Sequence, residues 1–502
     1  MNSLLQHRSF SWSFLFAACA MTTLLWLPSI DYPIVSDTSL YALLGESFWT
    51  KGAYAVLGEL HGKHLPVHAI FSYPLVAAFG YSIGMKLSTL LAGFGVLIAS
   101  FMLLRRTWSL EIAVWTTIAI VFHHGFIGMT SLGSADLLLT FFFLLTLHCY
   151  LSAGSNPRWY LGMGLFLGLA CLTRYNLVPL FAFFPFYTLW KRPKHLWNPW
   201  FISGMLLGAV LFSLWFIRAF VVLGGFQNDY TEDLTGKSAG LIQQFFINVQ
   251  YYLHPLRNIL PILLVASVYG VWKAGKKQPF LLTSMLAVWS LFAIWPVLNL
   301  RYAFPGYIIL IAFAVAGLLD ALSRLGRSFP AGPRLPVGQG RPALILIMLG
   351  LILSHGLALC LYQYGSCNAL WERAIDRIPK NLGLAMEGFY TWDQARDYVN
   401  RYARQGAQVV VAGKVNAIVM GEGIFRSDLS VVADTPTACP SYEIVYVPAD
   451  TRLASPATVF QTIDAPTAYV MLQRCAPTSA FAPSIRGATA DRPSPSPERG
   501  EG

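Results

Sequence analysis

Apolar runs of about 20 residues recur along most of this chain and constrain its fold more than any other feature. A helix of about 20 apolar residues crosses the ~30 Å hydrocarbon layer of a bilayer, so each run predicts a membrane span. A further apolar stretch at residues 69–80 is too short to cross, and we expect it to be interfacial or re-entrant. The predicted spans number about eleven and cover residues 11–30, 83–104, 110–128, 137–153, 160–172, 177–190, 201–223, 255–272, 280–297, 302–322 and 343–362.

The composition favours the same fold class. Of the 502 residues, 55% are hydrophobic and 14% aromatic, which is more apolar surface than a soluble domain can bury. The sequence therefore predicts a mainly α fold, a polytopic bundle of transmembrane helices over residues 1–362. A cleaved signal peptide is the rival interpretation of residues 11–30, but no small-residue cleavage site precedes Asp31, so we expect a retained helix.

The distribution of basic residues indicates orientation. The 35 Lys and Arg residues outnumber the 24 Asp and Glu residues, but most lie in short segments between apolar runs, so we expect no nucleic-acid partner. With a cytoplasmic amino terminus, 14 basic residues in the segments up to the last predicted span fall on the cytoplasmic side and 5 on the other. Because basic loops stay cytoplasmic, we predict a multi-pass protein of a bacterial-type inner membrane. Its first outer loop, residues 31–66, would be extracytoplasmic.

The segment after the last apolar run has a different character. Residues 363–475 contain short alternating or apolar stretches and predict a small extracytoplasmic α/β domain. Cys439 and Cys475 lie at its edges, and in an oxidising compartment they are candidates for a disulfide, although unpaired or otherwise paired thiols remain alternatives. Residues 476–502 are rich in Pro, Ser and Gly and predict a disordered tail.

The first outer loop gathers acidic residues in a chain that has only 12% charged residues. Asp37 follows the first apolar run and opens the helical-looking segment SLYALLGESFW. A carboxylate beside lipid can act as a general base on an acceptor, so Asp37 is the candidate base. The alternative is a helix N-cap with no further role.

Four other charged residues are site candidates. Asp136 lies at the outer edge of the fourth span, where an acid is either functional or a cap. Arg174 interrupts apolar sequence on both sides, Arg301 opens the tenth span, and Lys63 lies in the first loop. The three cations suit a lipid phosphate through charge-assisted hydrogen bonds. The alternative is that each one only anchors a helix end at the interface.

Three histidines in the same loop, His61, His64 and His68, form an H-x2-H-x3-H pattern. The pattern makes them weak candidates for a Zn²⁺ site. Gly62 and Pro66 interrupt the helix that would place the three rings on one face, so we expect no metal site here. Whether a divalent metal takes part elsewhere is left open, and the sequence calls for no other cofactor.

An ordered set of segments resembles a known superfamily. The acidic first loop is followed by SADLLLTFFFLLTLHCYL, GLACLTRYNLVPL and RYAFPGYIILIAFAVAGLL. In this order they resemble the C-type membrane glycosyltransferases, which include the protein O-mannosyltransferases and the lipid A aminoarabinose transferases. The likeness covers about residues 11–322.

The resemblance carries residue roles with it. It implies that Asp37 activates the acceptor, with Thr38 standing where the family commonly has a second acid. Lys63, in GKHLPVH, matches the family's lysine near the carrier phosphate. Asp136 matches the acid at the start of the fourth span, and Arg174 matches the Lys or Arg in a later turn. The missing second acid puts a metal-assisted reaction in doubt.

The function implied by the resemblance is an inverting transfer. A sugar would move from a polyprenyl-phosphate carrier to a lipid, protein or glycan acceptor on the extracytoplasmic face, next to membrane lipids. The alternative is a transporter or flippase of lipid-linked sugars, which would need cations for the phosphate but no base. Transporters have ionisable residues near the centres of several spans, whereas these candidates cluster at one face, which favours the enzyme.

Overall fold

The computed structural model contains two compact units, residues 1–390 and 391–502. The described residues are 8–30, 36–56, 59–223, 241–253, 261–292, 295, 300–328, 349–350, 399–403, 405–412, 429–432, 441–448, 458–460 and 467–474.

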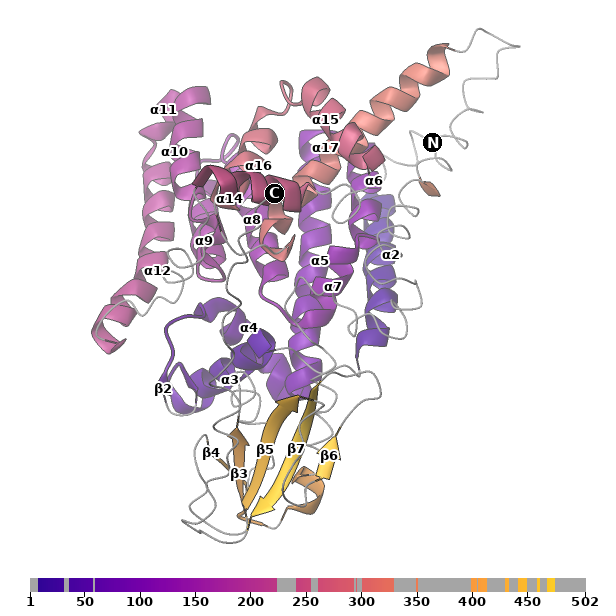
Figure 1. Cartoon of the computed structure of the whole chain (residues 1–502). Helices are drawn as coiled ribbons and strands as arrows, with labels where there is room; N and C mark the ends of the chain where they lie inside the picture. Colours follow the sequence, from indigo (N-terminus) through magenta and orange to yellow (C-terminus); the bar gives the residue numbers. More distant parts are fainter. Residues whose placement is uncertain are drawn as a thin grey trace, which may run out of the picture. The chain divides into compact units, whose positions relative to one another are not determined.

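The first unit is a bundle of helices, so the prediction of a mainly α fold is confirmed (Figure 1). Its short strands β1 (Ala55–Val56) and β2 (Glu59–Leu60) pair antiparallel. Its helices are α2 (Arg8–Trp26), η1 (Leu27–Ser29), α3 (Ser36–Lys51), α4 (Pro66–Phe79), α5 (Tyr81–Thr107), α6 (Leu110–Val121), α7 (His124–Leu132), α8 (Asp136–Ser152), α9 (Trp159–Cys171), η2 (Tyr175–Leu177), α10 (Leu180–Lys191), α11 (Pro193–Leu196), α12 (Pro199–Leu223), α14 (Leu241–Tyr252), α15 (Pro261–Ala274), α16 (Pro279–Phe292) and α17 (Leu300–Ser328).

Each of the first ten predicted apolar runs contains helical residues. Three described helices, α5, α12 and α17, are individually long and apolar enough to cross a membrane. Several others, among them α8 and α9, are apolar but shorter. The total of about eleven spans therefore stays a prediction.

One predicted span is not a single helix. The run at 110–128 is divided into α6 and α7, which meet at a bend of 60°. The ring of His123 provides the physical reason, because its Nδ1 accepts a hydrogen bond from the Gly125 amide at 3.1 Å and caps the start of α7. A new helix start is thereby stabilised inside an unbroken apolar run.

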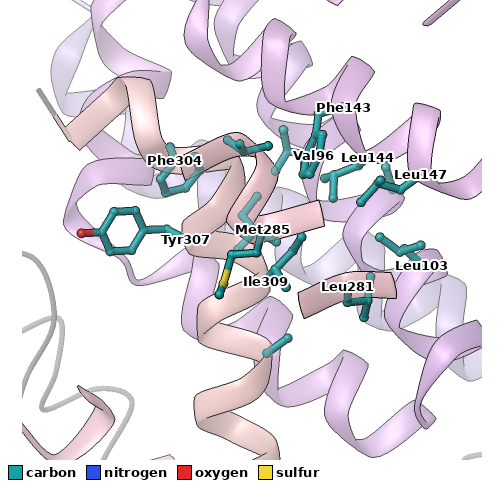
Figure 2. Close-up of a cluster of buried hydrophobic side chains, with 14 of the residues drawn as sticks. Val96, Leu103, Phe143, Leu144, Leu147, Leu281, Met285, Phe304, Tyr307 and Ile309 are labelled. Carbon is teal, nitrogen blue, oxygen red and sulfur yellow. The ribbon is translucent and has the colours of Figure 1, made fainter. Parts of the chain in front are cut away.

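The core of the bundle forms around α17. Of its most apolar stretch, 83% is buried, against 17% for α12. Figure 2 shows Phe304, Tyr307 and Ile309 of α17 within one apolar cluster that also includes Val96 and Phe143. Helix α17 is therefore internal, whereas α12 lies at the periphery, where its exposed apolar residues suit contact with lipid.

Two helices approach each other through paired glycines. Gly164 and Gly168 on α9 face Gly204 and Gly208 on α12, and each pair has the small-xxx-small spacing. A Cβ added at Gly204 would collide with the carbonyl oxygen of Tyr160. Close backbone packing therefore helps to join α12 to the bundle.

The second unit contains a five-stranded mixed sheet. The strand order is β4-β3-β5-β7-β6; β3 is parallel to β4 and β5, and β7 is antiparallel to β5 and β6. The strands are β3 (Gln408–Ala412), β4 (Ser430–Val432), β5 (Ser441–Pro448), β6 (Thr458–Phe460) and β7 (Thr467–Arg474).

Several sequence predictions lie outside the described residues. They are the tail at 476–502, Cys439 and Cys475, and all of the last predicted span except residues 349–350. The domain boundaries predicted at 362 and 475 also fall there.

We predict that Gly204→Ala destabilises the bundle by about 1–3 kcal/mol, because the new methyl group has no space against the α9 backbone. Thermal unfolding of the purified chain in detergent measures this. Gly128→Ala is the matched control, since a Cβ there meets nothing within 4 Å. Equal melting temperatures for the two variants would contradict the glycine-mediated contact.

Candidate functional site

Four charged side chains that are far apart in the sequence meet in the first unit. They are Asp37, Asp136, Arg174 and Arg301, which we call the charged cluster. Arg174 Nε lies 2.9 Å from Asp136 Oδ1, and Arg301 Nε lies 3.8 Å from Asp136 Oδ2. Arg301 Nη2 donates to Asp37 Oδ2 at 3.2 Å. The structure thus brings together four of the five charged residues that the sequence nominated.

Local structure explains where each charge lies. Asp37 is in the first turn of α3, and Asp136 is the first residue of α8, positions where the helix dipole favours an anion. Arg301 is in the first turn of α17, where the dipole disfavours a cation, so the nearby carboxylates compensate. Arg174 precedes η2 with an extended backbone.

Asp136 is the buried centre of the cluster. Its side chain has no exposed surface, and its carboxylate faces the two guanidinium groups. Neither of its oxygens accepts a hydrogen bond from the residues that the structure describes, so it does not cap α8. Asp136 therefore makes no capping hydrogen bond, and its carboxylate lies where it neutralises two mostly buried cations.

Both guanidinium groups also contact the ring of Tyr302. The Cζ atoms of Arg174 and Arg301 lie 5.1 Å and 5.2 Å from its centroid. The Tyr302 carbonyl accepts from Asn176 Nδ2 at 3.4 Å, which ties the turn after Arg174 to α17. Cation–π contact and the shared carboxylate together fix the spacing of the two arginines.

Asp37 is the accessible acid of the cluster, with 36% of its side chain exposed. Burial opposes ionisation of Asp37, but Arg301 and its other neighbours outweigh burial and lower its pKa from the usual value. Asp37 is therefore ionised at neutral pH and can accept a proton or a hydrogen bond.

The three histidines do not converge on one point. His61 Nε2 contacts His64 Nδ1 at 2.9 Å, whereas His68 Nε2 hydrogen-bonds the Gly133 carbonyl at 2.9 Å. Burial lowers the pKa of His64 to about 3, so its 3.9 Å contact with Asp37 joins a neutral ring to a carboxylate. Among the described residues, no group of three His, Cys, Asp or Glu side chains could hold a metal ion.

Thr38 stands where the resemblance led us to expect a second acid. Its buried hydroxyl donates to the Leu132 carbonyl at 2.7 Å, between α3 and the end of α7. A carboxylate here would face a carbonyl oxygen and would be repelled. The departure at Thr38 therefore has a structural role, because it fixes the helix that carries Asp37.

Lys63, the fifth nominated charge, is partly exposed beside His64 and helps to lower the His64 pKa. Arg218, on α12, was missed by the sequence analysis. It donates to the carbonyls of His61 at 3.0 Å and Tyr54 at 3.2 Å and stacks on Trp215 at 4.7 Å. It holds the first loop against the bundle, and the only sequence signal was a charge inside an apolar run.

Replacing Asp136 by Asn should destabilise the protein by about 3–5 kcal/mol, because two buried guanidinium groups would lose their shared anion. Thermal unfolding in detergent measures the loss. Glu111→Gln is the matched control, an exposed acid in the first turn of α6. If Asp136→Asn melts at the same temperature as Glu111→Gln, the buried carboxylate does not hold the cluster together.

Comparison with known proteins supplies a family context. Residues 44–224 match the profile of the dolichyl-phosphate-mannose-protein mannosyltransferase family, a range that includes Asp136 and Arg174. No curated protein sequence matches the chain.

The fold is similar to that of ArnT from Cupriavidus metallidurans. The crystal structure bound to undecaprenyl phosphate is 16% identical, with a TM-score of 0.61 over 92% of this chain and 98% of that one. The apo structure gives 16% identity and a TM-score of 0.57 over 93% and 98%. The Archaeoglobus fulgidus oligosaccharyltransferase tethered to an acceptor peptide is 11% identical in sequence, with a TM-score of 0.50 over 85% of this chain and 64% of that one. The profile match and the shared fold therefore confirm that this chain resembles the C-type membrane glycosyltransferases.

Proposed function

We propose that this protein is a membrane glycosyltransferase that transfers a sugar from a polyprenyl-phosphate carrier to an acceptor on the extracytoplasmic face. The observation that carries the proposal is the charged cluster, in which an accessible carboxylate lies beside two arginines. The ArnT structure that shares the fold contains undecaprenyl phosphate, a polyprenyl phosphate. The archaeal structure with a similar fold contains an acceptor peptide.

In this reaction Asp37 is the general base. It accepts the proton of the acceptor's nucleophilic group, which attacks the anomeric carbon of the donor sugar. The bond from that carbon to the phosphate oxygen breaks, and its electron pair leaves with the polyprenyl phosphate. Attack opposite the leaving group inverts the configuration at that carbon.

Arg174 and Arg301 neutralise the leaving group. The carrier phosphate changes from a singly charged diester to a monoester of higher negative charge, so cations stabilise the transition state more than the bound donor. Among the described residues, the terminal Nη atoms of Arg174 have no hydrogen-bond acceptor, which suits them to a phosphate. Lys63 is a further phosphate ligand, and Asp136 positions both arginines.

A transporter of lipid-linked sugars would also need the arginines, but it has no use for an ionised carboxylate that remains accessible. The 36% exposure of Asp37 beside the buried Asp136 therefore supports the enzyme. The acceptor class, whether lipid, protein or glycan, would be decided by what reaches Asp37.

We predict that Asp37→Asn lowers the transfer rate by about 10²–10⁴-fold, because the amide cannot take the acceptor's proton. Release of labelled sugar from a polyprenyl-phosphate donor in membranes measures the rate. Glu46→Gln, on the same helix, is the matched control, since Glu46 accepts a hydrogen bond from Tyr81 away from the cluster. A folded Asp37→Asn variant with the wild-type rate would show that Asp37 is not the base.

A further inference from the structure

We propose that Asp37 and the carrier phosphate compete for Arg301, so that donor binding releases Asp37 to act as the base. This proposal rests on the proposed function and adds an order to it: the donor binds first, and the acceptor is activated second. Arg301 is then the residue through which the donor site controls the base.

The contacts of Arg301 show which of its interactions can change. Its Nε faces Asp136 at 3.8 Å, and its Nη2 reaches Asp37 at 3.2 Å and the Tyr302 hydroxyl at 3.3 Å. Asp136 is fully buried on the bundle side, so it has no route to solvent. The Nη2 end of the guanidinium is thus the end that an incoming phosphate can take over.

The difference in exposure between the two carboxylates decides which of them a phosphate displaces from Arg301. Asp37 has 36% of its side chain exposed, so water can solvate it when it leaves Arg301. Asp136 would carry an uncompensated charge in the interior if it left, which is far more costly. Asp37 is therefore the anion that a phosphate displaces.

Charge balance within the charged cluster favours the departure of one anion. The charged cluster holds two cations and two carboxylates, so it has no net charge before the donor arrives. A phosphodiester adds a negative charge, and it meets the Asp37 carboxylate at the same nitrogen. Among the described residues, the other charged or titratable groups that face Asp37 are Arg174, which is held by Asp136, and His64, whose ring is neutral.

Displacement has a chemical consequence. While Arg301 holds it, the Asp37 carboxylate is a weak base, because the guanidinium stabilises its charged form. Once the phosphate has taken Arg301, the carboxylate loses that stabilisation and binds a proton more readily. Acceptor deprotonation is thereby coupled to the presence of a leaving group.

The test is a binding experiment that needs no transfer. Undecaprenyl phosphate alone is titrated into the full-length protein in nanodiscs, for wild type, Asp37→Asn, Arg301→Gln and the double variant. Asp37→Asn should tighten binding about fivefold, because the competing charge is gone. In the Arg301→Gln background the same substitution should change the affinity by less than about twofold, since the shared residue is absent.

Glu46→Gln is the control, because it removes a charge from the same helix and is expected to leave the affinity for undecaprenyl phosphate unchanged. If Asp37→Asn folds poorly, Asp37→Ser replaces it in the same titration. Unchanged or weaker binding by Asp37→Asn would overturn the competition. Equal tightening with and without Arg301 would overturn it too, because the effect would then be long-range. No binding by the wild type would overturn both proposals. An Asp37→Asn variant that binds tightly and still transfers sugar would overturn Asp37 as the base, and with it the order of binding and activation, but not the competition for Arg301.

Discussion

The buried Asp136 carboxylate, shared by Arg174 and Arg301, is the interaction on which the rest of the site depends. It joins the start of α8, the turn after α9 and the start of α17 at one point. Removing charges from water is costly, and a buried ion pair seldom adds net stability compared with apolar packing. Its presence inside a largely apolar bundle supports the proposal that the two arginines bind another anion.

The first loop is positioned against this point by polar contacts. Thr38 and His68 both reach the chain between α7 and α8, through the carbonyls of Leu132 and Gly133. Arg218 fixes the other side of the loop from α12. Asp37 thus lies on an element that is held at both ends, so its carboxylate meets Arg301 without being buried as Asp136 is.

Much of the helical fold could be predicted from the sequence, because lipid-compatible helices are unbroken apolar runs. The bend between α6 and α7 could not, since it depends on a histidine ring that caps a helix start, and the run remains apolar across it. Asp136 and Arg174 could be nominated because a lone charge amid apolar residues needs a partner, and each proved to be the other's. Spacing alone misgrouped His68 with His61 and His64, because its partner is a carbonyl distant in the sequence. Arg218 was missed because nothing in its own run indicates that it docks a loop.

The central claim is that the two arginines of the charged cluster hold a carrier phosphate. The most direct measurement is an experimental structure of the protein with undecaprenyl phosphate bound. The account predicts the phosphate within hydrogen-bonding distance of Arg174 and Arg301, with Asp136 still between their Nε atoms. A phosphate bound elsewhere, with Arg301 still paired to Asp37, would contradict it.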